Sequence, residues 1–82
     1  MATNEKSLKE IRKAFPDLVL MDATPQEIKN PFTGEGIVLQ PLEIALYDFI
    51  MGCNRMGKYD GVRKGCDWFR RYNAEAYMVL LD

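Results

Sequence analysis

The sequence contains no histidine, and this absence excludes several classes of catalytic site. Without an imidazole there is no Ser-His or Cys-His nucleophilic pair, and the usual ligand sets of zinc hydrolases cannot form. The two cysteines are too few for a zinc site made of four thiolates. Carboxylate pairs could still act as acid and base, but 82 residues leave little room for a cleft that excludes water. We therefore expect no enzyme and no catalytic, metal or cofactor site.

Long apolar runs and a cysteine-rich pattern are missing as well. No apolar run approaches the roughly 18 residues that a membrane span requires. The first ten residues, MATNEKSLKE, are polar and mixed in charge, unlike a signal or transit peptide. Cys53 and Cys66 lie among apolar neighbours at helical spacing, which favours buried free thiols over a disulfide, metal or redox role. We expect a cytoplasmic protein that does not enter a membrane.

The remaining composition indicates a single small globular domain spanning residues 1–82. Hydrophobic residues make up 48% of the chain and charged residues 28%, which is typical of soluble folded proteins. A chain of this length buries a modest core. Residues 1–3 are expected to form a disordered end.

The first helix is predicted for residues 4–15. Thr3 or Asn4 can cap its start, and Pro16 stops it. Four residues are spaced for one face of this helix: Leu8, Ile11, Arg12 and Phe15.

Short elements are predicted next. The apolar run at residues 18–21 favours a strand, and Thr24-Pro25 could open a single helical turn. A β-hairpin is then indicated, because residues 28–32 alternate toward Thr33-Gly34 and residues 37–39 return the chain. Pro31 would make the first strand an edge strand, and Gly36 could allow a bulge.

The second half is predicted to form three helices. The first starts at Gln40-Pro41 and ends at Gly57, the second spans residues 59–72 with Asp60 as cap, and the third spans residues 74–81 with Asn73 as cap. The apolar stripe of the first helix consists of Leu42, Ala45, Leu46, Phe49, Ile50, Cys53 and Met56. In the third helix the inward residues are Tyr77, Leu80 and Leu81.

The segment KGCDWFRRY (residues 64–72) combines aromatic and basic residues on one helix. Helical spacing separates them into two faces, so the aromatics are expected in the core and the arginines in water. The core face should carry Tyr59, Val62, Cys66 and Phe69. An adjacent ridge, where small residues let another helix approach, should carry Gly61, Gly65, Trp68 and Tyr72.

Basic residues concentrate in residues 55–71, although the chain as a whole has a net charge of −1. This basic arc has six cations and two acids, so its net charge is +4; the cations are Arg55, Lys58, Arg63, Lys64, Arg70 and Arg71. The arc indicates a solvated face or a patch for an acidic protein partner, and a nucleic-acid-associated factor using the same arc is the alternative. The residues expected to bind the partner are Arg63, Lys64, Arg70 and Arg71, with Trp68 at the edge.

Two stretches, NPFTGEGIVLQPLEIALYDFIMG (residues 30–52) and YDGVRKGCDWFRRYNAEAYMVLLD (residues 59–82), resemble small proteins of marine tailed phages of the cyanophage type. The matching residues include Asn30–Gly34, Trp68-Phe69 and Glu75–Tyr77. This resemblance has no established chemistry to transfer. It implies a phage accessory factor that binds a host or virion protein in the cytoplasm of an infected cell.

Together these patterns predict an α+β fold that is mostly α. An N-terminal helix and a small β-hairpin should pack on a C-terminal three-helix unit that contains a helical hairpin. The function expected for it is a non-catalytic protein-interaction module.

Overall fold

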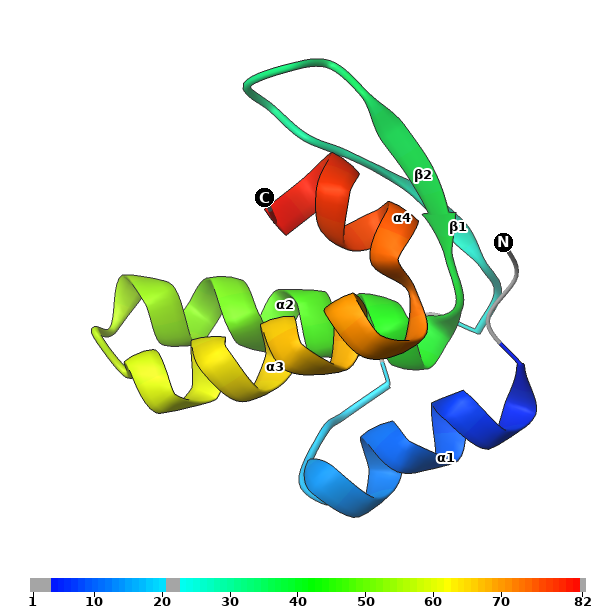
Figure 1. Ribbon diagram of the computed structural model, residues 1–82, viewed down its shortest axis with the longest axis vertical. Coiled ribbons are helices and arrows are strands. Elements are labelled where there is room, and N and C mark those ends of the chain that lie inside the picture. The colour runs from blue at the N-terminus through cyan, green and yellow to red at the C-terminus, as the bar shows by residue number, and fades with distance from the viewer. Residues whose placement is uncertain (1–3, 21–22, 82) are drawn as a thin grey trace.

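The computed structural model describes residues 4–20 and 23–81 and has the predicted mostly helical α+β architecture (Figure 1). Its elements in order are α1 (Glu5–Ala14), β1 (Gln26–Lys29), β2 (Gly36–Leu39), α2 (Pro41–Arg55), α3 (Tyr59–Tyr72), α4 (Ala74–Ala76) and the π-helix η1 (Tyr77–Leu81). The expected disorder of residues 1–3 lies outside the described residues. A tight turn joins the C-terminus of α2 to the N-terminus of α3. In Figure 1, α1 lies below this helix pair and α4 lies above it.

Helix α1 begins with the predicted asparagine cap. The side-chain oxygen of Asn4 accepts hydrogen bonds from the backbone N–H of Ser7 at 2.8 Å and from its hydroxyl at 2.7 Å. Ile11 and Phe15 are buried as predicted, but Arg12 is exposed and its guanidinium donates to the carbonyl of Leu18 at 3.5 Å. The inward position of Arg12 was therefore wrong, because a guanidinium at the edge of the apolar face keeps its charge in water.

Two further predictions, both for the segment between α1 and the hairpin, are wrong. Residues 18–20 form no strand, and Val19 is 73% exposed, since an apolar run becomes a strand only where another strand can pair with it. Met21, the last residue of that predicted strand, lies outside the described residues. The helical turn predicted at Thr24-Pro25 is also absent, because Gln26 pairs with Leu39 and so extends the hairpin to that point.

The hairpin itself is confirmed, with β1 and β2 antiparallel. Ile28 pairs with Ile37 in the middle of it. Pro31 lies in the turn and not in a strand, and Gly36 pairs directly with Lys29 without a bulge. Gly34 adopts φ of 78°, a backbone region that favours glycine. The turn therefore ends the strand earlier than the alternating pattern indicates.

Helices α2 and α3 form the helical hairpin that the sequence predicts. Pro41 is the first residue of α2, and Gly57 turns the chain with φ of 74°. The two glycines of the predicted ridge pack against α2 as expected, whereas Tyr72 at the end of the ridge is exposed. A Cβ added to Gly61 would lie 2.5 Å from the sulfur of Cys53, and one added to Gly65 would collide with Ile50. The missing side chains therefore allow the close approach of the two helices.

The tip of this hairpin corrects two predictions about buried residues. Met56 is 69% exposed and Tyr59 is 64% exposed, although both fit the apolar stripes of their helices. Met56 lies beyond the end of α2 and Tyr59 is the first residue of α3, so neither has a facing turn of the other helix to cover it. Asp60 is not the cap either, because the N-cap position of α3 is Lys58.

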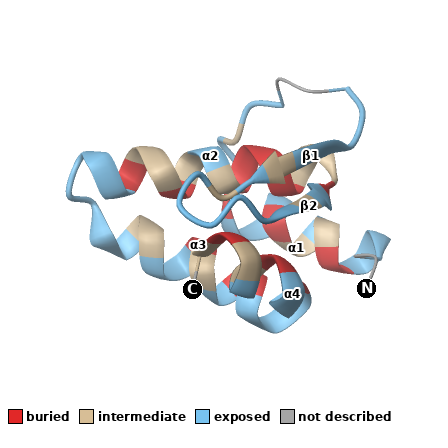
Figure 2. Ribbon diagram, turned by 90° about the horizontal axis from the view of Figure 1, so that it is seen from above, coloured by how far each residue is buried: buried red, intermediate tan, exposed pale blue. Residues whose placement is uncertain are grey.

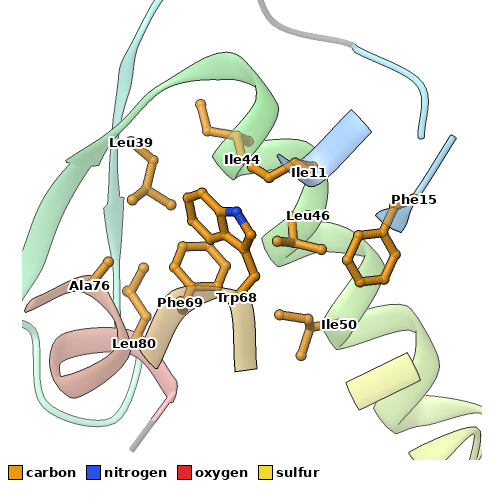
Figure 3. Packing of buried hydrophobic residues seen from close by; sticks show 10 residues of the cluster. All are labelled: Ile11, Phe15, Leu39, Ile44, Leu46, Ile50, Trp68, Phe69, Ala76 and Leu80. Carbon is orange, nitrogen blue, oxygen red and sulfur yellow. The ribbon is translucent and has the colours of Figure 1, made fainter. Parts of the chain in front are cut away.

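The core lies where α1, β2, α3 and the C-terminal helical segment meet the first half of α2 (Figure 3). Phe69 is fully buried, and the ring of Trp68 packs edge-on against it at a centroid distance of 5.0 Å. The indole N–H of Trp68 donates to the carbonyl of Ser7 at 3.0 Å, which holds α1 on α3. The helix predicted for residues 74–81 is one α-helical turn, capped by Asn73, that continues as the π-helix η1.

A buried polar pair lies beside this core. The carboxylate of Glu43 accepts from the backbone N–H of Gln40 at 2.8 Å and from the side-chain amide of Asn73 at 2.7 Å. It thereby links the start of α2 to the start of α4. On the other side of α4 and η1, the side-chain amide of Asn30 donates to the carbonyl of Val79 at 3.0 Å and fixes the β-hairpin.

Candidate functional site

The basic residues predicted to bind a partner are all exposed on α3. Arg63 and Arg70 are seven residues apart and share one side of the helix, and Lys64 and Arg71 share another. We call these four residues the basic face. The basic face thus consists of two pairs of cations, and the exposed Asp67 lies between the pairs in the helical rotation.

Arg70 is the member of the basic face that the fold holds most firmly. Its guanidinium forms an ion pair with Asp67 and lies over the ring of Tyr77, 5.3 Å from the centroid. The hydrogen bond that the Arg70 guanidinium donates to the Asp67 carboxylate is the main reason why the pKa of Arg70 is raised. Arg70 therefore has less freedom to reach a partner than a cation without such contacts.

A cleft between α1 and α3 brings together three of the five predicted site residues, Lys64, Trp68 and Arg71. Its volume is about 250 Å³, and Glu10 and Asp67 line it as well. We call it the α1–α3 cleft. Two cations and two acids in one cleft give a surface of mixed charge, which suits polar contacts with a peptide or protein better than a run of phosphates.

Trp68 differs from the other predicted site residues because it is only 5% exposed. It was expected at the edge of the binding patch, and the structure places it in the core with a small part of its surface in the α1–α3 cleft. Its indole N–H is already engaged with Ser7. The ring therefore shapes the cleft as a wall and offers a partner little contact area.

A larger hollow lies at the tip of the α2–α3 hairpin, where the sequence predicted no site. This tip hollow has a volume of about 890 Å³ and is formed by the last turns of α2, the connecting turn and the first turn of α3. Figure 2 shows this tip as an exposed end of the molecule. The lining includes Phe49, Gly52, Met56, Lys58, Tyr59 and Gly61.

A second hollow has a volume of about 280 Å³ and shares two lining residues with the first. Both are lined by Phe49 and Gly61, and the second one extends to Phe15 and Leu18 at the end of α1. The sequence signals that could have indicated this surface were Gly52 in the last turns of α2 and the apolar residues Met56 and Tyr59 beside Gly57.

The two cysteines do not add a reactive site. Both are free; Cys53 is buried, as predicted, and Cys66 is partly buried. Burial raises the pKa of the Cys66 thiol, and the nearby Arg70 opposes this effect in part. The described residues contain no group of three or more His, Cys, Asp or Glu side chains placed to hold a metal ion.

Comparison with protein families, with curated proteins and with solved structures found no match to this chain. The similarity to marine phage proteins therefore stays a prediction based on the residues quoted for it. Within the part of the chain that the structure describes, no helix has the length and apolar character of a membrane span.

Proposed function

We propose that the protein is a non-catalytic interaction module that docks on a partner protein through the basic face of α3. The observation that supports this proposal is the exposure of Arg63, Lys64 and Arg71 on a helix whose other side supplies Phe69 to the core. Within the described residues these three cations take part in no ion pair. Their charge therefore contributes little to the fold and is free to meet an acidic surface.

The proposed biological setting follows from the resemblance to marine tailed-phage proteins. In that setting the chain is an accessory factor, and its partner is a host or virion protein in the cytoplasm of the infected cell. The mode of action is occlusion or docking, because the α1–α3 cleft offers contact surface of mixed charge beside the basic face.

Nucleic-acid association is the alternative that a test has to separate from protein docking. The placement of Asp60 and Asp67 on the same exposed side of α3 argues against it, because both carboxylates would repel phosphates. A salt series distinguishes the two interactions. Affinity for nucleic acid falls steeply with increasing salt, whereas affinity that depends on buried apolar area does not.

The proposed function is tested with a variant in which Arg63, Arg70 and Arg71 are all replaced by glutamine. Exposed substitutions of this kind usually change stability by less than about 0.5 kcal/mol each, so we expect the fold to persist. The variant should lose the partner that the parent protein captures from an infected-cell lysate. As the matched control, Lys6, Lys9 and Lys29 are replaced by glutamine, which removes the same charge from exposed sites elsewhere.

If the control variant lost the captured partner as completely as the α3 variant, the proposal would be wrong. The total positive charge of the protein, and not the basic face, would then explain the capture. Binding of mixed-sequence nucleic acid by the parent at micromolar concentration and physiological salt, lost in the α3 variant, would replace this function with the nucleic-acid alternative.

A further inference from the structure

We propose that the outer edge of β1 pairs with the same edge of a second copy of this chain. The two hairpins would then form one antiparallel sheet across a two-fold axis. The axis would pass beside Ile28, the third residue of β1. This surface belongs to a different element from the basic face of α3, so it adds self-association to the proposed function.

The outer edge of β1 carries backbone groups without a partner. Among the described residues the sheet consists of β1 and β2, so β1 is paired on one side only. The backbone N–H of Asn30 donates to the carbonyl of Glu35 at 2.8 Å, in register with the ladder. Because the bonds of an antiparallel ladder alternate, Ile28 also points its N–H and C=O toward β2, whereas Glu27 and Lys29 point theirs outward. These outward groups form no backbone hydrogen bond elsewhere in the described ranges.

This edge is accessible to a second chain. Glu27 and Lys29 are exposed, and the hairpin lies at the margin of the molecule (Figure 1). A Cβ added to Gly36 would lie 3.2 Å from side-chain carbons of Glu27 and 3.1 Å from one of Lys29. Both charged side chains therefore lie on the outer face of the hairpin, above Gly36. Ile28 lies on the other face and packs against the core.

The charges of β1 select one register for the pairing. An antiparallel second copy could place Glu27 opposite Glu27, Lys29 opposite Lys29, or Glu27 opposite Lys29 and use the outward groups. Like charges directly opposite each other destabilise a strand pair, whereas opposite charges stabilise it. Only the last register joins opposite charges, and the two-fold axis forms this pair twice. The edge of β1 is therefore complementary to itself.

Two prolines act against the other registers. With Glu27 opposite Glu27, Lys29 would face Pro25 of the second copy; with Lys29 opposite Lys29, Glu27 would face Pro31. Proline has no N–H to donate to a ladder, so hydrogen bonds would be lost in both cases. In the remaining register Glu27 of each copy exchanges its N–H and C=O bonds with Lys29 of the other.

The position of Ile28 adds an apolar contact to this pairing. On the axis, Ile28 of one copy lies opposite Ile28 of the other in a non-hydrogen-bonded pair, where side chains come closest. Both side chains are already partly buried on the core-facing side of the hairpin. The strand has four residues, so we expect a weak dimer whose population rises with protein concentration.

Sedimentation and NMR over a series of protein concentrations test the self-association of the full chain. The sedimentation coefficient should rise with concentration toward that of a dimer. The backbone amides of Glu27 and Lys29 should shift and exchange with solvent more slowly as the concentration rises, because they enter the new ladder. A parent protein that stays monomeric over the whole series, or concentration-dependent shifts confined to other elements, would overturn the proposal.

Charge variants test the register. Glu27→Lys and Lys29→Glu each place two like-charge pairs across the axis, so each variant alone should associate at least about tenfold more weakly than the parent. An equimolar mixture of the two variants should associate again, because one strand then carries only cations and the other only acids. This recovery would also show that both variants are folded. The double variant Glu27→Lys, Lys29→Glu should associate like the parent.

The matched control is Lys9→Glu, the same charge change on the exposed side of α1. It should leave the self-association of the parent unchanged. If this control weakened the association as much as Lys29→Glu, or if the mixture of the two β1 variants stayed monomeric, pairing through β1 would be wrong.

Discussion

Single polar residues connect the helices of this fold through buried hydrogen bonds, in addition to the apolar core. Glu43 is 1% exposed, and its carboxylate binds the backbone of Gln40 and the side chain of Asn73. An acid in the first turn of a helix is common, but its second partner thirty residues later is a property of the tertiary structure. The sequence indicated a favourable helix start at this position and gave no sign of the buried connection.

Replacing Glu43 by glutamine should destabilise the protein. The two carboxylate oxygens of Glu43 accept hydrogen bonds from Gln40 and Asn73. A glutamine has an NH₂ group in place of one of these oxygens, so one buried hydrogen bond is lost at a cost of about 1–3 kcal/mol. Denaturant titration measures this change. Glu27→Gln, at an exposed position of β1, is the control and should be nearly neutral. An equally stable Glu43→Gln protein would show that this connection contributes nothing.

Two glycines on facing helices should respond in opposite directions to the same substitution. Gly65→Ala places a methyl group against Ile50, which is buried and β-branched, and overpacking of this kind costs about 1–3 kcal/mol. This cost exceeds or cancels the gain in helix propensity of up to about 1 kcal/mol. Gly52→Ala has the same propensity gain and no collision, so it should stabilise the protein. Thermal or denaturant unfolding of the pair would contradict the packing if Gly65→Ala were the more stable.

At the scale of elements, the long helices were predictable and the short segments were not. Helices α2 and α3 combine apolar residues at spacings of three and four with proline at the start of α2 and glycine at its end, so local signals agree with the tertiary structure. Residues 18–20 are apolar but have no strand to pair with. Strand β1 forms although the sequence before it predicts a helix start, because β2 pairs with β1. Those outcomes depend on neighbours that a local pattern does not specify.

Burial should slow the modification of both thiols in the folded protein. Cys53 is buried against Gly61, and burial raises the pKa of Cys66, which lowers its thiolate fraction near neutral pH. Thiol reagents should therefore label the native protein slowly and the denatured protein fast. The labelling time course at neutral pH, with and without denaturant, measures this difference. Fast stoichiometric reaction of Cys53 without denaturant would mean that the two helices separate readily.

At the scale of the whole molecule, the predicted basic residues were found exposed, but the larger hollow was not predicted. Exposure of Arg63, Lys64, Arg70 and Arg71 follows from their positions opposite Phe69 on one helix, which sequence spacing determines. The tip hollow depends on the missing side chain of Gly52 in α2 and on the exposed side chains of Met56 and Tyr59 at the turn. Its existence requires the distance between α2 and α3, which periodicity does not provide.

The described elements should unfold in one cooperative transition. Trp68 packs in the common core and bonds to Ser7 of α1, so its fluorescence reports the docking of α1 while far-UV circular dichroism reports all helices. The two signals should change at the same denaturant concentration. An earlier change in fluorescence would show that α1 leaves the remaining helices before they unfold.

The bond between Trp68 and Ser7 joins residues 61 positions apart, and this separation has a consequence for synthesis on the ribosome. At about 5–20 residues per second, translation takes roughly 3–12 s to proceed from one partner to the other. During that interval the side of α1 that will rest on Trp68 has no permanent cover, so Ile11 stays accessible to chaperones that hold nascent chains. A cell that makes this protein rapidly would therefore depend on such chaperones most while α1 waits for α3.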